Sequence, residues 1–230
     1  GESSDKWEAI LSLKMDDAEA FEALRAIYSA SGREAELAAL LARWVAVHPS
    51  PPTALLLELS EARLANPGMA QDALNTLMRA HAADGENRQV FDKMIEVLSL
   101  LEDWPGVLAA YDSWLALEHS GINARDFEMA SEVALSKQSD LAAAVRYLVH
   151  GLDSGRAPTP WLDRLQVVAR EHDAFEAVVQ SVDSWVETCP DVELVNLVDD
   201  RLMEWAAGGA PAAFRLRRAC ERRMATDAND

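Results

Sequence analysis

The chain has 230 residues, half of them hydrophobic, and its 39 acidic and 21 basic side chains give a formal net charge of −18 and a pI of about 4.6. The apolar content excludes a disordered chain, and the charge argues against binding nucleic acid or anionic lipid through the general surface. Two cysteines exclude a disulfide scaffold, and no apolar run reaches the ~18–20 residues of a membrane helix. No targeting segment is visible, so the location stays open, with the cytoplasm as the default expectation.

The first segment of the chain, residues 1–16, predicts a short leading helix. In it, Trp7 and Ile10 take the positions that Leu41 and Trp44 take in the helical hairpin that follows. We therefore expect the second helix of a repeat whose first helix is missing, and we hypothesise that the chain is a piece of a longer array.

Tryptophans mark an internal repeat. Trp44, Trp114 and Trp185 lie 70 and 71 residues apart, and halfway between them the same position falls on Ala80 and Gly151. The repeating unit is therefore about 35 residues long, with a large residue alternating with a small one. This alternation predicts big-to-small packing between successive units, with the three tryptophans in the core.

The clearest unit is residues 88–121, which predicts two helices joined by a tight turn. Phe91, Met94 and Leu98 form one apolar stripe, and Pro105 suits the first turn of a new helix. The period then gives six hairpins in chain order: 17–50, 51–86, 88–121, 122–156, 157–190 and 191–224. We expect one domain over residues 17–224 and a frayed tail at 225–230.

Helix–turn–helix units with a period near 34 residues resemble the tetratricopeptide (TPR) repeat. In the first hairpin Phe21, Leu24 and Tyr28 match the large first-helix residues of the motif, Gly32 lies at the turn and Pro49 closes the unit. The resemblance implies an all-α fold, a right-handed α-solenoid of about six hairpins, with HEAT-like arrays as the alternative. The motif is degenerate, because its close-packing glycine is replaced by Arg25, Glu61, Ile95, Glu132, Gln166 and Arg201.

Catalytic motifs are missing from the sequence. It contains no HExxH, GxGxxG, P-loop or GxSxG pattern, and the five histidines are dispersed late in predicted helices, where a cation is favourable. We therefore expect no catalysis, no cofactor and no metal. A helical-repeat enzyme with a central cavity is the third alternative.

In TPR-like arrays the first helices line a concave groove, so the resemblance implies which side chains face it. On this template the polar groove positions carry eight acidic and two basic side chains; they are Glu19, Glu22, Ser29, Glu58, Asn66, Gln89, Asp92, Glu96, Ser99, Asp126, Lys137, Asp163, Arg170 and Glu171. A uniformly acidic surface explains the same count. The apolar contacts expected in the groove are Leu55, Leu100, Met129 and Val133.

The function that these features predict is a non-catalytic scaffold or adaptor that binds a basic or helical segment of a partner protein. The expected partner-binding residues are Glu19, Glu22, Glu58, Asp92, Glu96, Asp126 and Met129. A second, basic surface is expected near the C-terminus at Arg215, Arg217, Arg218, Arg222 and Arg223. The alternative is an assembly subunit that self-associates, acidic body to Arg-rich helix, into a homo-oligomer or larger complex. Nucleic acid and membrane insertion are not expected.

Overall fold

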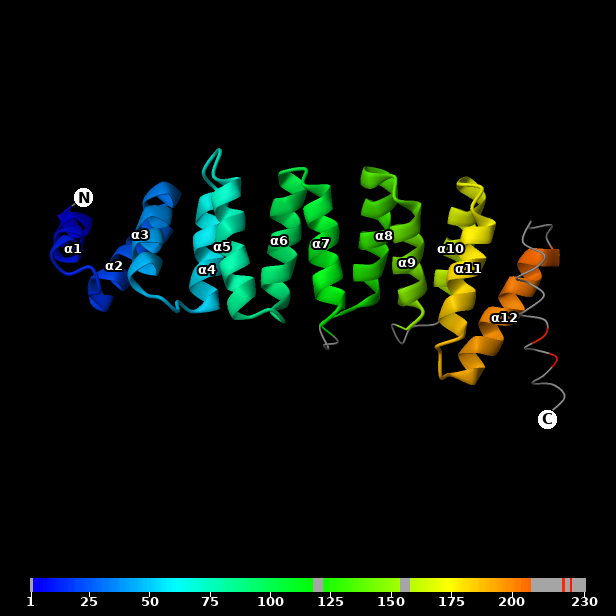
Figure 1. Cartoon of the computed structure of the whole chain (residues 1–230). Helices are drawn as coiled ribbons and strands as arrows, with labels where there is room; N and C mark the ends of the chain where they lie inside the picture. Colours follow the sequence, from blue (N-terminus) through cyan, green and yellow to red (C-terminus); the bar gives the residue numbers. More distant parts are fainter. Residues whose placement is uncertain (1, 118–121, 154–157, 208–220, 222–223, 225–230) are drawn as a thin grey trace. The chain divides into compact units, whose positions relative to one another are not determined.

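The computed structural model describes residues 2–117, 122–153, 158–207, 221 and 224, and in these residues it contains helices and no strand (Figure 1). The helices are α1 (Glu2–Leu13), α2 (Ala18–Ala30), α3 (Glu34–Val47), α4 (Thr53–Leu64), α5 (Ala70–Ala83), α6 (Arg88–Leu100), α7 (Trp104–Leu115), α8 (Ala124–Gln138), α9 (Leu141–Gly151), α10 (Thr159–Glu171), α11 (Phe175–Val186) and α12 (Val192–Ala207). None of the described helices is long and apolar enough to cross a membrane.

The chain divides into two compact units. The N-terminal unit, residues 1–121, holds α1 to α7, and the C-terminal unit, residues 122–230, holds α8 to α12. The division falls between the third and fourth of the expected hairpins. A single domain over 17–224 therefore stays a prediction, and the two units are described one at a time.

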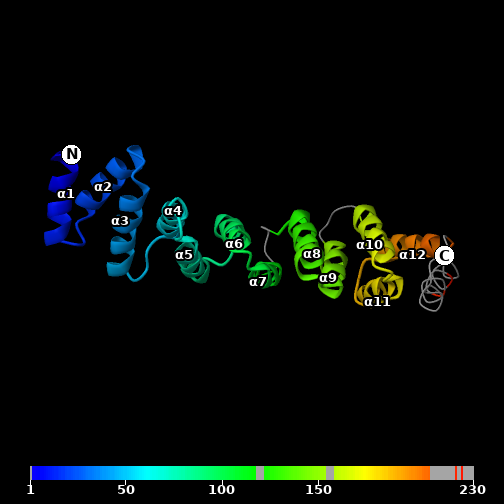
Figure 2. The same ribbon diagram turned by 90° about the horizontal axis from the view of Figure 1, so that it is seen from above.

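In the N-terminal unit each helix packs against the next one along the chain, as α4 and α5 do in Figure 2. Side chains at the helix starts explain the boundaries. Asp17 caps α2 by accepting a hydrogen bond from the backbone N–H of Ala20 at 3.1 Å, and Asn87 caps α6 in the same way. Gly32, at φ 63°, supplies the left-handed residue between α2 and α3.

Stacked aromatic pairs lie in the core of the first and third hairpins of this unit. The ring of Phe21 stacks on Trp44 with centroids 4.1 Å apart, and Phe91 stacks on Trp114 at 4.4 Å. Trp114 is fully buried, whereas Trp44 is half-buried and also stacks on His48. The expected burial of the repeat tryptophans is thus complete for Trp114 and partial for Trp44.

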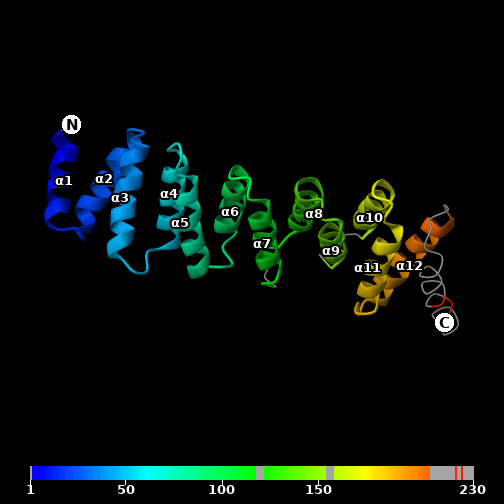
Figure 3. The ribbon, with the colours of Figure 1, turned by 45° about the horizontal axis from the view of Figure 1, so that its top comes forward.

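In the C-terminal unit α8 pairs with α9 and α10 with α11, and α9 and α12 both pack on α10 (Figure 3). Gly151 at the end of α9 faces the indole of Trp161 so closely that a Cβ atom there would lie 2.7 Å from the ring. Trp185, 7 % exposed, donates a hydrogen bond from its indole nitrogen to Asp153 at 2.9 Å. The large-to-small packing expected around Gly151 therefore involves Trp161 of the next hairpin.

The predicted all-helical array of hairpins is confirmed over the described residues. Its turns lie where the sequence places them, for example between α4 and α5 and between α8 and α9. The second helix expected in 191–224, and the tail at 225–230, lie outside the described residues apart from positions 221 and 224.

Candidate functional site

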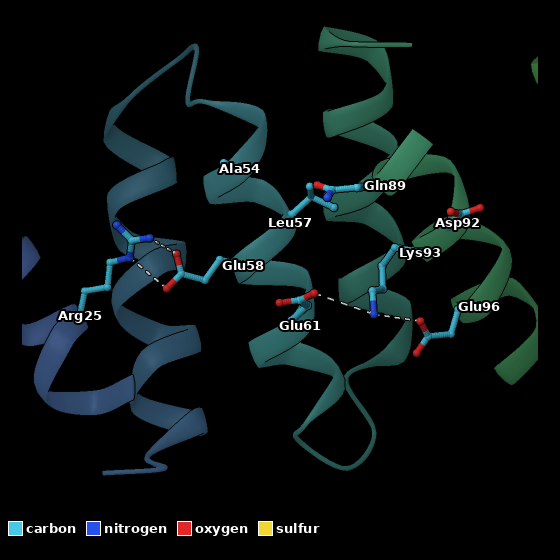
Figure 4. A pocket seen from close by; sticks show the side chains of 9 residues that line it. All are labelled: Arg25, Ala54, Leu57, Glu58, Glu61, Gln89, Asp92, Lys93 and Glu96. Atoms are coloured by element: carbon cyan, nitrogen blue, oxygen red, sulfur yellow. Dashed lines mark hydrogen bonds and ion pairs between the residues drawn. The ribbon is translucent and has the colours of Figure 1, made fainter. Parts of the chain in front are cut away.

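The N-terminal unit has a hollow of about 570 Å³ on the face formed by α2, α4 and α6 (Figure 4). Its lining side chains are Arg25 from α2, Ala54, Leu57, Glu58 and Glu61 from α4, and Gln89, Asp92, Lys93 and Glu96 from α6. On α4 and on α6 these positions follow the spacing i, i+3, i+4 and i+7, which is one face of a helix. We call this site the acidic groove, because it contains four carboxylates against two cations.

One wall of the acidic groove is an ion pair between two first helices. The Arg25 guanidinium donates from Nε to Glu58 Oε1 at 2.9 Å, and its Nη2 lies 2.6 Å from Glu58 Oε2. A second carboxylate, Glu22, lies 3.2 Å from Nη1. The hydrogen bond to Glu58 raises the pKa of the Arg25 guanidinium above its ordinary value. The pair joins α2 to α4 by one charge-assisted hydrogen bond and one further close ionic contact.

The opposite wall centres on Lys93. Its ammonium lies 2.9 Å from Glu96 of the same helix and 3.9 Å from Glu61 of α4, as the dashed lines in Figure 4 show. The hydrogen bond to Glu96 raises the pKa of Lys93 above its ordinary value. Asp92 is paired outside the groove lining, with Arg88 at 2.8 Å. Every carboxylate of the groove therefore has at least one cation close to it.

These carboxylates differ in their exposure to solvent. The Glu58 side chain is 23 % exposed, whereas those of Glu61, Asp92 and Glu96 are 61 %, 56 % and 61 % exposed. Ion pairs this exposed contribute little to folding, about 0–1 kcal/mol each. The three exposed carboxylates can therefore exchange their present partners for those of a ligand at small cost, while Glu58 is tied to the fold.

The structure brings together three of the residues predicted to bind a partner, Glu58, Asp92 and Glu96. Glu22 is exposed and pairs with Arg25 at the edge, and Glu19, exposed in the first turn of α2, is not part of the lining. The expected apolar contact Leu55 is buried in the core at 8 % exposure; its neighbour Leu57 lines the groove instead.

Asp126 does not have the exposed groove position that the sequence suggested. It is 2 % exposed and accepts a hydrogen bond from the backbone N–H of Asn123 at 3.0 Å, which closes a capping box at the start of α8. Its carboxylate therefore serves the helix terminus. Met129, on α8 of the C-terminal unit, is half-buried. The arginines of the expected basic surface, Arg215, Arg217, Arg218, Arg222 and Arg223, lie outside the described residues.

A metal centre is not visible in the described ranges, where no group of three or more His, Cys, Asp or Glu side chains is placed to hold an ion. The expectation that the chain is not an enzyme stays a prediction.

The chain matches no protein-family model and no curated protein. Among solved structures, it is similar to one of Naa15/Naa10 bound to HypK-THB, with 16 % identity and a TM-score of 0.54. That match covers 95 % of this chain and 34 % of the other, so the chain spans about a third of its length. The fold is TPR-like.

Two structures of TPR proteins are also similar, at lower TM-scores. One is a tetratricopeptide repeat protein from Parabacteroides merdae, at 12 % identity and a TM-score of 0.48, covering 98 % of this chain and 80 % of that one. The other is YrrB, a TPR protein with an unusual peptide-binding site, at 14 % identity and a TM-score of 0.46, covering 83 % and 96 %.

The two basic side chains of the acidic groove, Arg25 and Lys93, were not predicted from the sequence, although the motif positions contain a signal for their contacts. Arg25 and Glu61 both occupy the first-helix position where the TPR motif has its close-packing glycine. A long polar side chain at that position reaches the neighbouring first helix, as the contacts Arg25–Glu58 and Glu61–Lys93 show. The departures from the motif therefore coincide with the walls of the groove.

Proposed function

We propose that the chain is a non-catalytic interaction scaffold whose acidic groove binds a basic segment of a partner protein. The observation that supports this function is the hollow between α4 and α6, edged by the exposed carboxylates of Glu61, Asp92 and Glu96. Stacked helical hairpins give extended surfaces that suit a peptide segment. A lysine or arginine of the ligand would replace the intramolecular partners of these carboxylates.

The formal charge of −18 assists such a partner before contact. A negative field steers a cationic segment toward the groove and raises the association rate, which then falls as salt screens the field beyond about 8–10 Å. Exposed rim charges of this kind act mainly on the association rate.

The first prediction tests the groove with E61Q/D92N/E96Q in the full chain. The probe is a fluorescein-labelled 15-residue peptide with a lysine at every fourth position, and fluorescence anisotropy measures its binding at low salt. We expect the triple variant to bind about tenfold more weakly, because three lost charge contacts of roughly 0.5 kcal/mol each sum to about 1.5 kcal/mol. Glu58 is left unchanged, since its ion pair with Arg25 joins α2 to α4 and its loss would disturb the packing of the two helices.

The control is D16N/E86Q/E102Q, which makes the same change in net charge at exposed positions between helices. It should bind the lysine peptide nearly as well as the unmodified chain. Equal weakening by the two triple variants would mean that overall charge, and not the groove, attracts the peptide, and would refute the proposal.

A second candidate occupant of the acidic groove is the Arg-rich segment of another copy of the chain. Its five arginines between residues 215 and 223 match the chemistry of the groove. A peptide with the sequence of residues 212–224 would then compete with the lysine peptide, and sedimentation would detect oligomers that the groove triple variant disperses. A concentration-independent monomer would exclude this assembly and leave the partner segment as the occupant.

A further inference from the structure

The C-terminal unit has a hollow of its own, of about 440 Å³, between α8 and α10. It is lined by Leu135 from α8 and by Pro160, Asp163, Arg164, Val167, Val168 and Glu171 from α10. The α10 positions form one stripe along the helix, because they recur at three- and four-residue steps. Along the stripe, the apolar pair Val167 and Val168 lies between Asp163 and Arg164 on one side and Glu171 on the other.

This stripe corresponds to the one that lines the acidic groove, shifted by 71 residues, the same interval that separates Trp114 from Trp185. Gln89, Asp92, Lys93 and Glu96 of α6 fall on Pro160, Asp163, Arg164 and Val167 of α10. The acid and the base of α6 recur in α10, whereas the positions of Gln89 and Glu96 carry the apolar residues Pro160 and Val167. The two units thus present the same first-helix face with different chemistry.

The apolar part of this hollow is accessible. Three of the apolar side chains that line this hollow differ in exposure. Val167 of α10 is 48 % exposed, Leu135 of α8 is half-buried, and Val168 of α10 is buried at 4 % exposure. A ligand side chain that covers Val167 and Leu135 removes apolar surface from water, which is the main source of affinity in such a hollow. The acidic groove also has apolar side chains, Ala54 and Leu57, but four carboxylates line it, against two in this hollow.

The charged ends favour a cation beside that apolar side chain. Asp163, 51 % exposed, already contacts Arg201 of α12, but an exposed carboxylate can accept a second cation. Glu171 is exposed at the C-terminal end of α10, and Arg164 is the single base in the lining. Arg201 offsets part of the Asp163 charge from outside the lining, so the preference of this edge for a cationic neighbour comes mainly from Glu171.

We propose that the α8–α10 hollow is a second binding site, which takes a bulky apolar side chain flanked by lysine or arginine in a protein segment. It differs from the acidic groove in its main interaction, which is apolar burial. It also lies in the other unit.

The test follows the methyl NMR signals of Leu135 and Val167 in the full chain labelled at Leu and Val methyl groups. The probes are acetylated and amidated pentapeptides, Lys-Lys-Leu-Lys-Lys and Lys-Lys-Ala-Lys-Lys. The leucine peptide should shift both methyl signals in a saturable way, with at least about fivefold higher affinity than the alanine peptide, since the leucine buries more apolar surface. Equal affinities would overturn the proposal.

The decisive variant is Val167→Glu, which places in this hollow the residue that α6 has at the matching position, Glu96. It should reduce the preference for the leucine peptide over the alanine peptide, read at Leu135, from at least about fivefold to about one, because the glutamate removes the apolar contact while it attracts the lysines of both peptides alike. Val192→Glu is the matched control, since Val192 is 62 % exposed on α12 and lies outside the lining. If Val167→Glu binds as the control does, the hollow is not the site.

The acidic groove and the α8–α10 hollow can be tested independently of one another. E61Q/D92N/E96Q should leave the methyl shifts at Leu135 unchanged while it weakens the lysine peptide, and a loss of both would show that the second site is not independent. Val167→Thr, a smaller change at the same position, should give an intermediate loss of leucine-peptide affinity and guards against misfolding of the glutamate variant. No loss with a folded Val167→Thr and Val167→Glu would contradict the proposal.

Discussion

Trp114 is the largest fully buried side chain of the N-terminal unit, and its ring stacks on that of Phe91. Trp7 on α1 is half-buried by comparison. We expect the two tryptophans to contribute differently to stability, because Trp114 is fully buried and Trp7 is not.

We expect Trp114→Ala to lower the free energy of unfolding by about 3–5 kcal/mol, because it removes a buried ring and leaves a cavity. Trp7→Ala should cost clearly less. Urea unfolding followed by circular dichroism measures both losses without relying on tryptophan fluorescence. Equal losses would argue that Trp114 is not a packing residue of the core and that its ring has another use.

Tyr28 joins α2 to the leading helix. Its hydroxyl donates a hydrogen bond to Glu8 at 2.8 Å, and burial, helped by that bond, raises the pKa of Tyr28 to about 12. Because the folded state keeps the proton above the ordinary pKa of about 10, it binds more protons than the unfolded chain between these values. The stabilisation is complete below pH 10 and is lost as the pH rises towards 12.

We therefore expect the free energy of unfolding to fall between pH 10 and 12 by about 2 kcal/mol more in the unmodified chain than in Tyr28→Phe. Deprotonation of lysines acts on both proteins and cancels in the difference. Urea unfolding of both proteins at a series of pH values measures this difference. Parallel pH profiles would mean that Tyr28 titrates alike in the folded and unfolded states.

At the scale of the helices, the sequence predicts most of what the structure contains. The stripe of Phe91, Met94 and Leu98 predicts α6, and the structure adds that Asp17 and Asn87 cap the N-terminal ends of α2 and α6. These features depend on neighbours within four residues, so they can be recognised without the fold.

Contacts between helices could not be predicted in the same way. The Arg25–Glu58 pair joins residues 33 positions apart in the sequence. It forms only because α2 packs near α4 and because both long side chains adopt conformations that bring their charged groups together. Asp126 shows the opposite limit: its position on a repeat template suggests a groove, but the local capping box with Asn123 decides its orientation. A charge count on template positions therefore overestimated the number of free carboxylates.

Charge acts on the whole molecule in two opposing ways. The net charge of −18 favours expansion through self-repulsion, whereas pairs such as Lys93–Glu96 and Arg33–Glu36 are attractive but solvent-exposed. Exposed pairs contribute little each, so the repulsion should dominate.

We accordingly expect the melting temperature to rise by about 2–5 °C when NaCl increases from roughly 10 to 300 mM, since salt shortens the range of the repulsion. Circular dichroism melts at fixed pH measure this change. A falling melting temperature would mean that the network of ion pairs outweighs the repulsion.

The contact between Gly151 and Trp161 has a consequence for how such a chain can vary. A methyl group on Gly151 would overlap the indole, and a smaller ring at Trp161 would leave a void against Gly151. Neither position can change alone without loss of packing, so substitutions there must arise as pairs in which the summed volume is kept. Substitutions at Gly151 and Trp161 should therefore be coupled in evolution, although the two residues belong to neighbouring hairpins.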